Sequence, residues 1–234
     1  MTERPLRILL VGHGRMGRMV EALAPELNFE IAAALRSADA AALANGRPEW
    51  HDVAAAIDFS TGPAFAANLP KLAALKLNVV VGTTGWQAQE PQLRHAVAEA
   101  GIGLVAAPNF SLGVNLFEAI IEHATRLFAN QPAYGAWLHE AHHSAKRDAP
   151  SGTALLLKAA MERAGYNRPI DIASTRAGAI PGTHTIGFDG PGEAVVLSHT
   201  ARDRTIFARG ALEAARWVQG RQGWFTMRDV LGLT

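Results

Sequence analysis

Short apolar runs and longer amphipathic stretches alternate along the first half of the chain. Compact apolar runs bounded by turn or polar residues predict buried strands at Leu6–Val11, Phe29–Ala34, Ala54–Phe59, Asn78–Val81 and Ile102–Ala106. The Ala- and Leu-rich stretches that separate or follow these runs predict helices at Met16–Leu23, Pro63–Leu75, Gln87–Ala100 and Leu112–Phe128. Such alternation is typical of a parallel sheet covered by helices on both faces, and therefore predicts a doubly wound α/β domain.

The pattern changes after Gln131–Pro132. A strand from Tyr134 is predicted to lead into a His-rich loop, and a helix is predicted from Ser151 to about Arg163. Glycine-containing turns then separate three β-like runs, which are Ile170–Arg176, Thr183–Phe188 and Ala194–Thr200. This punctuation indicates a second, α+β domain with a mixed open sheet.

The C-terminal tail contains one helix-like stretch, Gly210–Gln219, which is too short to form a domain. We expect the tail to pack back on the first domain. The predicted division is residues 1–110 with 204–234 for the first domain and residues 111–203 for the second.

Composition points to a small-molecule partner. The 234 residues, 49% of them hydrophobic, are enough to bury one large core or two smaller ones. The formal net charge is +1 and there is no long run of Lys or Arg, so neither nucleic acid nor a membrane surface is expected as a partner. The absence of cysteine excludes disulfides, a thiolate nucleophile and Cys-ligated metal sites, and we expect no metal.

The N-terminal segment is not typical of a secretory signal. The apolar stretch Ile8–Val11 runs straight into a glycine loop, without a longer apolar segment or a small-residue cleavage site. No segment approaches the roughly 20 apolar residues that a membrane helix needs. We therefore expect a cytoplasmic protein.

A G-x-G-x-x-G motif follows the first predicted strand and opens the first predicted helix. Gly12 would permit the tight turn, Gly14 the close approach of a pyrophosphate, and Gly17 the close packing of helix and strand. An ordinary glycine-rich turn is the alternative, but the position at the start of the alternating series favours a Rossmann-like dinucleotide-binding domain. The residues expected to contact the cofactor here are Gly12, His13, Gly14, Arg15, Met16 and Gly17.

The end of the second predicted strand bears on cofactor choice. NAD-selective folds usually carry an acidic residue there to hold the ribose 2′-hydroxyl, whereas this sequence has Arg36 and no acidic residue before Asp39. A guanidinium suits a 2′-phosphate, so we predict NADPH in preference to NADH. The alternative is a solvated surface arginine.

Two further loops follow predicted strands, where a doubly wound sheet binds its ligands. Their small and hydroxyl residues suit contact with the nicotinamide ribose, although simple turn chemistry is the other interpretation. The candidate cofactor residues in them are Gly82, Thr83, Thr84, Ala107, Pro108, Asn109 and Phe110.

The densest chemistry lies in residues 140–153. Four positively chargeable side chains fall within six positions, namely His142, His143, Lys146 and Arg147. The segment from Ser151 to Thr153 then opens a predicted helix, whose free backbone N–H groups form an anion site. Each part has an ordinary structural explanation, but together they favour a pocket for carboxylates.

A formal zinc-peptidase motif overlaps this segment. His139–Glu140–Ala141–His142–His143 matches H-E-x-x-H, which requires a helix so that the first and last histidines lie on one face. Pro132 and Pro150 leave little length for such a helix, and no third ligand is evident. The zinc hypothesis is therefore the weaker one.

The chain resembles the 4-hydroxy-tetrahydrodipicolinate reductase family. The resemblance spans nearly the whole chain and is most specific in the block E-A-H-H-x-x-K-x-D-A-P-S-G-T. The other matching segments are Gly14–Gly17, Asp58–Ser60, Gly82–Gly85, Asn109–Asn115, Arg176, Ile180–Gly182, Gly192–Glu193, Leu197–His199, Arg204, Phe207–Ala211 and Asp229–Leu231.

The resemblance implies an NAD(P)H-dependent reduction of a cyclic dicarboxylate to tetrahydrodipicolinate in diaminopimelate and lysine biosynthesis, by a homotetramer assembled through the second domain. It implies that Lys146 is the general acid and His142 its companion, with substrate carboxylates held by His143, Ser151, Gly152 and Thr153. Two departures concern the cofactor site: the glycine loop is one residue shorter than the family's, with His13 as spacer, and the acidic residue after the second strand is replaced by Arg36. A nicotinamide-binding sensor without turnover is the alternative from another class.

Overall fold

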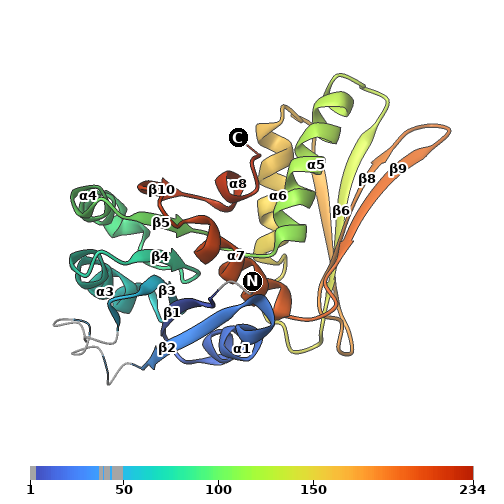
Figure 1. Ribbon diagram of the computed structural model, residues 1–234. Coiled ribbons are helices and arrows are strands. Elements are labelled where there is room, and N and C mark those ends of the chain that lie inside the picture. Colours follow the sequence, from blue (N-terminus) through green and yellow to red (C-terminus); the bar gives the residue numbers. More distant parts are fainter. Residues whose placement is uncertain (1–3, 37–38, 40–42, 44–49, 234) are drawn as a thin grey trace. The chain divides into compact units, whose positions relative to one another are not determined.

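The computed structural model describes residues 4–36, 39, 43 and 50–233. The chain divides into two compact units, and its elements are labelled in Figure 1. Unit 1 comprises Met1–Leu112 with Thr205–Thr234, and unit 2 comprises Gly113–Arg204. Within the described residues, no helix is both long and apolar enough to cross a membrane.

Unit 1 is built on a six-stranded sheet in the order β10-β5-β4-β3-β1-β2, with all neighbours parallel. Most of its strands are buried on both faces, which explains why they are continuous apolar runs in the sequence. The strands are β1 (Leu6–Val11), β2 (Phe29–Leu35), β3 (Val53–Asp58), β4 (Asn78–Val81), β5 (Gly103–Ala106) and β10 (Gly223–Phe225).

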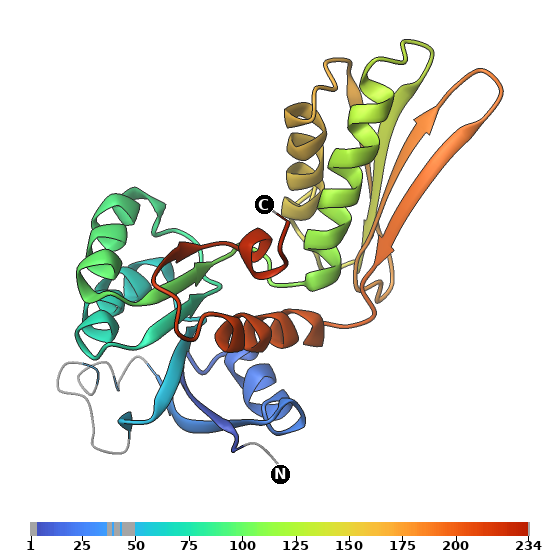
Figure 2. The ribbon, with the colours of Figure 1, turned by 45° about the horizontal axis from the view of Figure 1, so that its top comes forward.

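Helices cover both faces of this sheet (Figure 2). Ile8 and Leu10 of β1 pack into one core with α1 and α7, whereas Leu9 and Val11 pack into a second core with α3 and α4. The helices are α1 (Arg15–Leu23), α3 (Gly62–Ala74), α4 (Glu90–Ala100), α7 (Thr205–Trp217) and α8 (Met227–Val230), with 3-10 turns η1 (Pro25–Leu27) and η4 (Gln87–Gln89). The predicted doubly wound α/β fold is confirmed.

Unit 2 is a four-stranded mixed sheet in the order β7-β6-β8-β9, with β6 parallel to β7 and antiparallel to β8. One face packs against two helices through Phe117, Ile121, Leu157 and Phe188 (Figures 1 and 2). The elements are α5 (Leu112–Ala129), β6 (Gly135–His142), α6 (Gly152–Arg163), β7 (Ile170–Arg176), β8 (Thr183–Asp189) and β9 (Ala194–Thr200). The predicted mixed sheet is also confirmed.

The tail differs from its prediction. α7 begins at Thr205, five residues before the predicted start, and Gly210 lies inside it. A Cβ on Gly210 would lie 1.7 Å from the carbonyl oxygen of Phe110, so glycine is required there for close packing and does not start the helix. β10 and α8 were not predicted, because three and four residues are too few to show a periodic pattern.

Candidate functional site

The glycine loop lies where the strand order of unit 1 reverses. β1 has β2 on one side and β3 on the other, and sheets of this type bind ligands beyond the carboxyl ends of the strands at this point. Gly12 has φ +90°, and a Cβ there would lie 2.5 Å from the Ser60 nitrogen. A Cβ on Gly17 would lie 2.3 Å from the Gly12 carbonyl oxygen. Both positions therefore require glycine.

The N-terminus of α1 is open to an anion. Its N-cap, Gly14, makes no side-chain cap hydrogen bond, and its first turn contains no acidic residue. A Cβ built on Gly14 would meet no atom within 4 Å. First-turn N–H groups carry partial positive charge and bind phosphate, so this loop fits the pyrophosphate of a nicotinamide dinucleotide.

The side chains of the loop have different surroundings. His13 Nε2 lies 2.7 Å from the Glu21 carboxylate, which ties the ring to α1. Met16 is partly buried against the core of unit 1, whereas Arg15 is exposed. The loop backbone and Arg15 are thus available to a ligand, while Met16 mainly supports the helix.

The segment Asp58–Ser60, at the end of β3, contacts both the glycine loop and the predicted cofactor loop after β4. Its Phe59 ring packs so closely on Gly82 that a Cβ there would lie 2.1 Å from the ring. The Ser60 carbonyl accepts a hydrogen bond from the Thr83 hydroxyl at 3.3 Å. Sequence reasoning gave this turn no role, although its position at the end of a predicted strand was a usable signal.

Asp58 is a buried carboxyl at the switch point of the sheet. Its Oδ1 accepts hydrogen bonds from the Ser60 nitrogen at 2.8 Å and from the Ser60 hydroxyl at 2.6 Å. Its Oδ2 is buried and has no hydrogen-bond partner within the part of the chain that the structure describes. Burial raises the pKa of Asp58 to about 6, although the two Ser60 hydrogen bonds act in the opposite direction.

In the loop after β5, mainly backbone groups are available to a ligand. Phe110 is buried, and its ring meets Phe59 edge-on with 6.2 Å between centroids. Asn109 Oδ1 accepts from the Ser111 nitrogen at 2.9 Å, and Pro108 is exposed. Buried Ala107 donates its N–H to the end of β4.

Arg36 lies one residue beyond β2 and is exposed. Its backbone N–H donates to the Asp39 carboxylate at 2.9 Å. Because β1, β2, β4 and β5 are parallel, their carboxyl ends share one edge of the sheet. The structure therefore brings Arg36, the glycine loop, the exposed Thr84 and the loop after β5 to the same edge.

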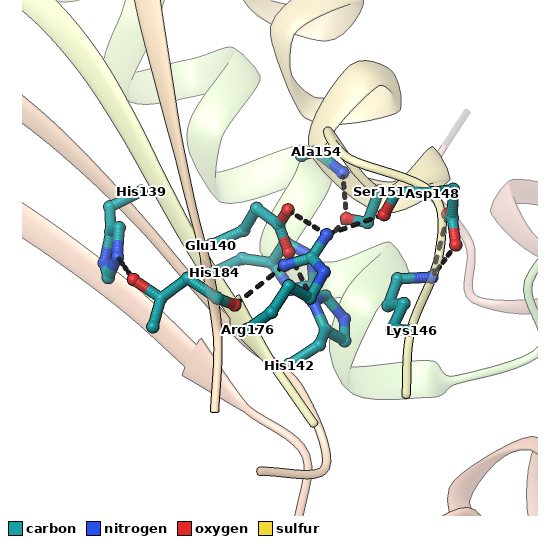
Figure 3. Close-up of polar contacts among 10 residues, drawn as sticks. His139, Glu140, His142, Lys146, Asp148, Ser151, Ala154, Arg176 and His184 are labelled. Carbon is teal, nitrogen blue, oxygen red and sulfur yellow. Dashed lines mark hydrogen bonds and ion pairs between the residues drawn. The ribbon is translucent and has the colours of Figure 1, made fainter. Parts of the chain in front are cut away.

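In unit 2 the predicted His-rich loop is largely strand, because β6 continues through His142. Side chains alternate along a strand, so Leu138, Glu140 and His142 share the buried face while His139 points to the other. His139 there meets the Thr175 hydroxyl at 2.9 Å, as Figure 3 shows. The H-E-x-x-H segment is thus not helical, and the zinc-peptidase hypothesis is wrong.

Glu140 is fully buried and paired with two basic groups. It accepts a hydrogen bond from Arg176 Nη2 at 2.6 Å and makes a very short contact with His142 Nδ1. Burial opposes ionisation of Glu140, but the hydrogen bonds from Arg176, Ser174 and His142 outweigh it and lower the pKa to about 2. Glu140 is therefore ionised at neutral pH.

His142 is held in its neutral form. Its pKa is lowered by burial first and further by the charges of Lys146 and Arg176, against the opposing effect of Glu140. The His184 ring lies 5.1 Å from it, edge to face, with a pKa lowered to about 4, mainly by burial. Two neighbouring neutral imidazoles thus line this side of the cluster.

Lys146 belongs to the loop between β6 and α6. Its Nζ lies 2.7 and 2.8 Å from the two carboxylate oxygens of Asp148, and the pair lowers the pKa of Asp148. Arg176 Nη2 also donates to the Asp148 carbonyl at 2.7 Å. Figure 3 shows the Arg176 guanidinium between Glu140 and Asp148. The loop that carries Lys146 is thus tied to the buried strand residues.

The start of α6 is the second candidate anion site. Ser151 is the N-cap, and its buried hydroxyl accepts from the Ala154 nitrogen at 3.2 Å and meets His184 Nε2 at 3.1 Å. Gly152 is exposed, and a Cβ there would meet nothing within 4 Å. Gly152 and Thr153 are accessible at this terminus, whereas the Ser151 side chain is committed to the cap.

Glu140, His142 and His184 each offer a ligand atom, and these atoms lie within 4.8 Å of one another. Such a group could hold a metal ion. Its atoms are already hydrogen-bonded, however, and the Arg176 cation is one of the partners. The arrangement therefore favours a hydrogen-bond network over a cation site.

Fold and site together define a class of protein. A doubly wound sheet with an open glycine loop, joined to a mixed-sheet unit with a basic cluster, is the architecture of a two-unit nicotinamide-dependent oxidoreductase.

Comparisons with known proteins give the family. Residues 6–110 match the model for the N-terminus of dihydrodipicolinate reductase, and residues 113–231 match the model for its C-terminus. The chain therefore belongs to the dihydrodipicolinate reductase family, as the sequence resemblance predicted.

Individual relatives match this chain over nearly their whole length. The chain is 41% identical to a 4-hydroxy-tetrahydrodipicolinate reductase of Stenotrophomonas maltophilia, covering 99% of this chain and 100% of the relative. It is 39% identical to the enzyme of that name from Laribacter hongkongensis, covering 97% and 98%. A dipicolinate-bound dihydrodipicolinate reductase from a Paenisporosarcina species has the same fold, with TM-score 0.78, 22% identity and coverage of 95% of this chain and 97% of that one.

Proposed function

We propose that the chain catalyses the NAD(P)H-dependent reduction of 4-hydroxy-tetrahydrodipicolinate to tetrahydrodipicolinate in diaminopimelate and lysine biosynthesis. One hydride and one proton enter the ring, and one water leaves. The bound reduced nicotinamide supplies the hydride. The observation that carries the proposal is the position of Lys146, which is paired with Asp148 in the loop that leads into α6 and lies near neutral His142, in a chain that belongs to this reductase family.

Unit 2 would bind the substrate and supply the proton. The N–H groups at Gly152 and Thr153, with the side chain of His143, would hold the carboxylates of the ring, and Ser151 would fix the helix start that presents them. Lys146 would release Asp148 and protonate the ring atom where negative charge accumulates. His142 would act as its companion in proton transfer.

Unit 1 would bind the cofactor through its backbone. The glycine loop from Gly12 to Gly17 would hold the pyrophosphate, and the loops after β4 and β5 would contact the nicotinamide ribose. The exposed Arg36 supports NADPH as the preferred cofactor, because a guanidinium can pair with a 2′-phosphate.

A homotetramer assembled through unit 2 and a cytoplasmic location stay predictions. The edge strand β9 supports assembly through this unit, because it exposes Val195 and Val196 at 39% and 52%.

Turnover with the purified chain tests the function. The substrate is made in place from pyruvate and aspartate semialdehyde by the upstream synthase, and NADPH oxidation is followed. We expect Lys146→Ala to lower kcat by about 10²- to 10⁴-fold, the usual contribution of a general acid. Lys158→Ala is the matched control, because Lys158 lies on α6 of the same unit and is also paired with a carboxylate, that of Glu162.

Two outcomes would contradict the proposal. Nucleotide binding without turnover in the unmodified chain would favour the sensor. Equal loss of activity in Lys146→Ala and Lys158→Ala would show that Lys146 has no special part in the reaction.

A further inference from the structure

We propose that Glu140 is a positioning residue that holds His142 in one tautomer, with its proton on Nδ1 and with Nε2 free to accept a hydrogen bond. We further propose that Arg176 couples this orientation to the loop that carries Lys146. The inference rests on the proposed function, in which His142 and Lys146 act together. It concerns residues that have no role in that function so far.

The contact between Glu140 and His142 determines the tautomer. Glu140 is completely buried and ionised, so its carboxylate can only accept hydrogen bonds. Its Oε2 is in very short contact with His142 Nδ1. That nitrogen must therefore carry the proton, and in a neutral imidazole Nε2 is then the acceptor.

Glycine at position 182 leaves space beside Nε2 of His142. The backbone of Gly182 lies against this edge of the ring, and a Cβ on Gly182 would lie 3.0 Å from Nε2 and 3.2 Å from Cδ2. The His142 side chain keeps 11% exposure. A larger residue at position 182 would cover the nitrogen that the Glu140 contact leaves free.

Arg176 connects the tautomer to the proton donor. One nitrogen of its guanidinium, Nη2, donates both to Glu140 Oε1 at 2.6 Å and to the Asp148 carbonyl at 2.7 Å. Asp148 in turn holds Lys146. A displacement of Glu140 would therefore reach both groups proposed to move protons.

Among the residues that the structure describes, the charged and titratable groups that face His142 are Glu140, His184, Lys146 and Arg176. Glu140 is the only anion among them, and it raises the His142 pKa while burial, Lys146 and Arg176 lower it. Replacing Glu140 by a neutral residue is therefore expected to lower the His142 pKa further.

Nuclear magnetic resonance of the ring nitrogens tests the tautomer without any assay of turnover. In the full chain labelled with ¹⁵N-histidine, with His142→Gln used to assign the signal, we expect a protonated Nδ1 and an unprotonated Nε2. The opposite tautomer, or an equal mixture, would overturn the proposal even if the reductase activity is present. The same tautomer in a chain without reductase activity would instead contradict the proposed function alone.

Glu140→Gln tests the consequence. We expect the His142 tautomers to mix, kcat to fall by at least about tenfold, the KM for NADPH to stay unchanged, and the acidic limb of the kcat/KM profile to move to lower pH. Glu140→Asp keeps the negative charge and should recover part of the tautomer signal and of kcat. If Glu140→Gln does not fold, the unmodified chain and Glu140→Asp still decide the question.

Glu118→Gln is the matched control. Glu118 is also buried in unit 2 and paired with an arginine, Arg163, at 3.0 Å. We expect this variant to lose stability but to keep the His142 signal and the pH profile. If both variants lower kcat equally without a shift of the profile, Glu140 has only a structural role and the proposal is wrong.

Discussion

Backbone groups form most of the candidate site of unit 1, whereas paired side chains form that of unit 2. The glycine loop has an uncapped helix start and positions where no Cβ fits. The cluster around Glu140 instead consists of charges that compensate one another through Arg176 and Lys146. A larger side chain is therefore expected to damage the site of unit 1 most, whereas a change of charge is expected to damage the site of unit 2 most.

Each site contains a buried carboxyl group, and the pKa values of the two groups are shifted in opposite directions. Glu140 is surrounded by donors, which hold its pKa at about 2. Burial raises the pKa of Asp58 to about 6, because the two hydrogen bonds from Ser60 do not outweigh it and the second carboxyl oxygen has no hydrogen-bond partner among the described residues. Unit 1 therefore carries an uncompensated acid at its switch point, and unit 2 does not.

The largest effect is expected from added volume in the glycine loop. Gly17→Ala should cost unit 1 about 3 kcal/mol or more, because the new Cβ meets a backbone carbonyl that cannot turn away. Gly14→Ala has open space and should fold normally, but its methyl group would occupy the approach of the pyrophosphate and weaken NADPH binding by about tenfold or more. Thermal unfolding and calorimetric titration with NADPH measure the two effects.

Gly135→Ala provides the control for this pair, because a Cβ on Gly135 would also meet no atom within 4 Å and Gly135 lies in unit 2. It should change neither NADPH binding nor the stability of unit 1. Normal NADPH binding by Gly14→Ala would contradict the pyrophosphate site at this loop.

The next effect concerns the uncompensated carboxyl. The pKa of Asp58 is about 6 in the folded chain and near 3.8 in the unfolded chain, so folding favours the protonated form. Its contribution to stability is complete below the lower value and is lost as the pH rises through the higher one, a change of about 3 kcal/mol. Asp58→Asn removes this titration. The free energy of unfolding of the variant, relative to that of the unmodified chain, should therefore rise by up to about 3 kcal/mol between pH 4 and pH 8.

Asp52→Asn is the control, since Asp52 lies just before the other end of β3. Burial opposes its ionisation, but Arg7 outweighs burial and lowers the pKa, so this carboxylate contributes stability above its unfolded pKa and loses it as the pH falls. Chemical unfolding should show the stability difference for Asp58→Asn changing between pH 4 and pH 8. The difference for Asp52→Asn should stay flat there and change, with the opposite sign, only as the pH falls below about 3.8. A flat difference for Asp58→Asn would show that this carboxyl is compensated.

Local patterns explain why so much of the fold was predictable. Strands β4, β7 and β9 have the bounds that the sequence predicted, because each run is enclosed by turn or polar residues. α7 was misjudged because Gly210 was taken as a boundary, when it is the point of contact with Phe110. That contact joins residues far apart in the chain, and periodicity within one segment cannot show it.

The candidate sites also differ in how far local sequence could predict them. The glycine loop is a local motif, so its role could be predicted from spacing and position alone. The partners of Glu140 could not, because Arg176 lies on the neighbouring strand β7, 36 positions away. The pairing of β6 with its neighbours also decides against zinc, since it places His139 and Glu140 on opposite faces.

The smallest effect would sharpen the comparison, because Arg36 is a candidate in unit 1 that is expected to act through its side-chain charge and not through its backbone. Arg36→Glu should lower the ratio of kcat/KM for NADPH to that for NADH by about tenfold or more, since one charged hydrogen bond contributes about 1.5–3 kcal/mol. Arg18→Glu, at an exposed position of α1, makes the same change of charge in the same unit and should leave the ratio nearly unchanged. Equal ratios in the two variants would mean that Arg36 is a solvated surface residue, and that the nucleotide site of unit 1 owes its selectivity to its backbone as well.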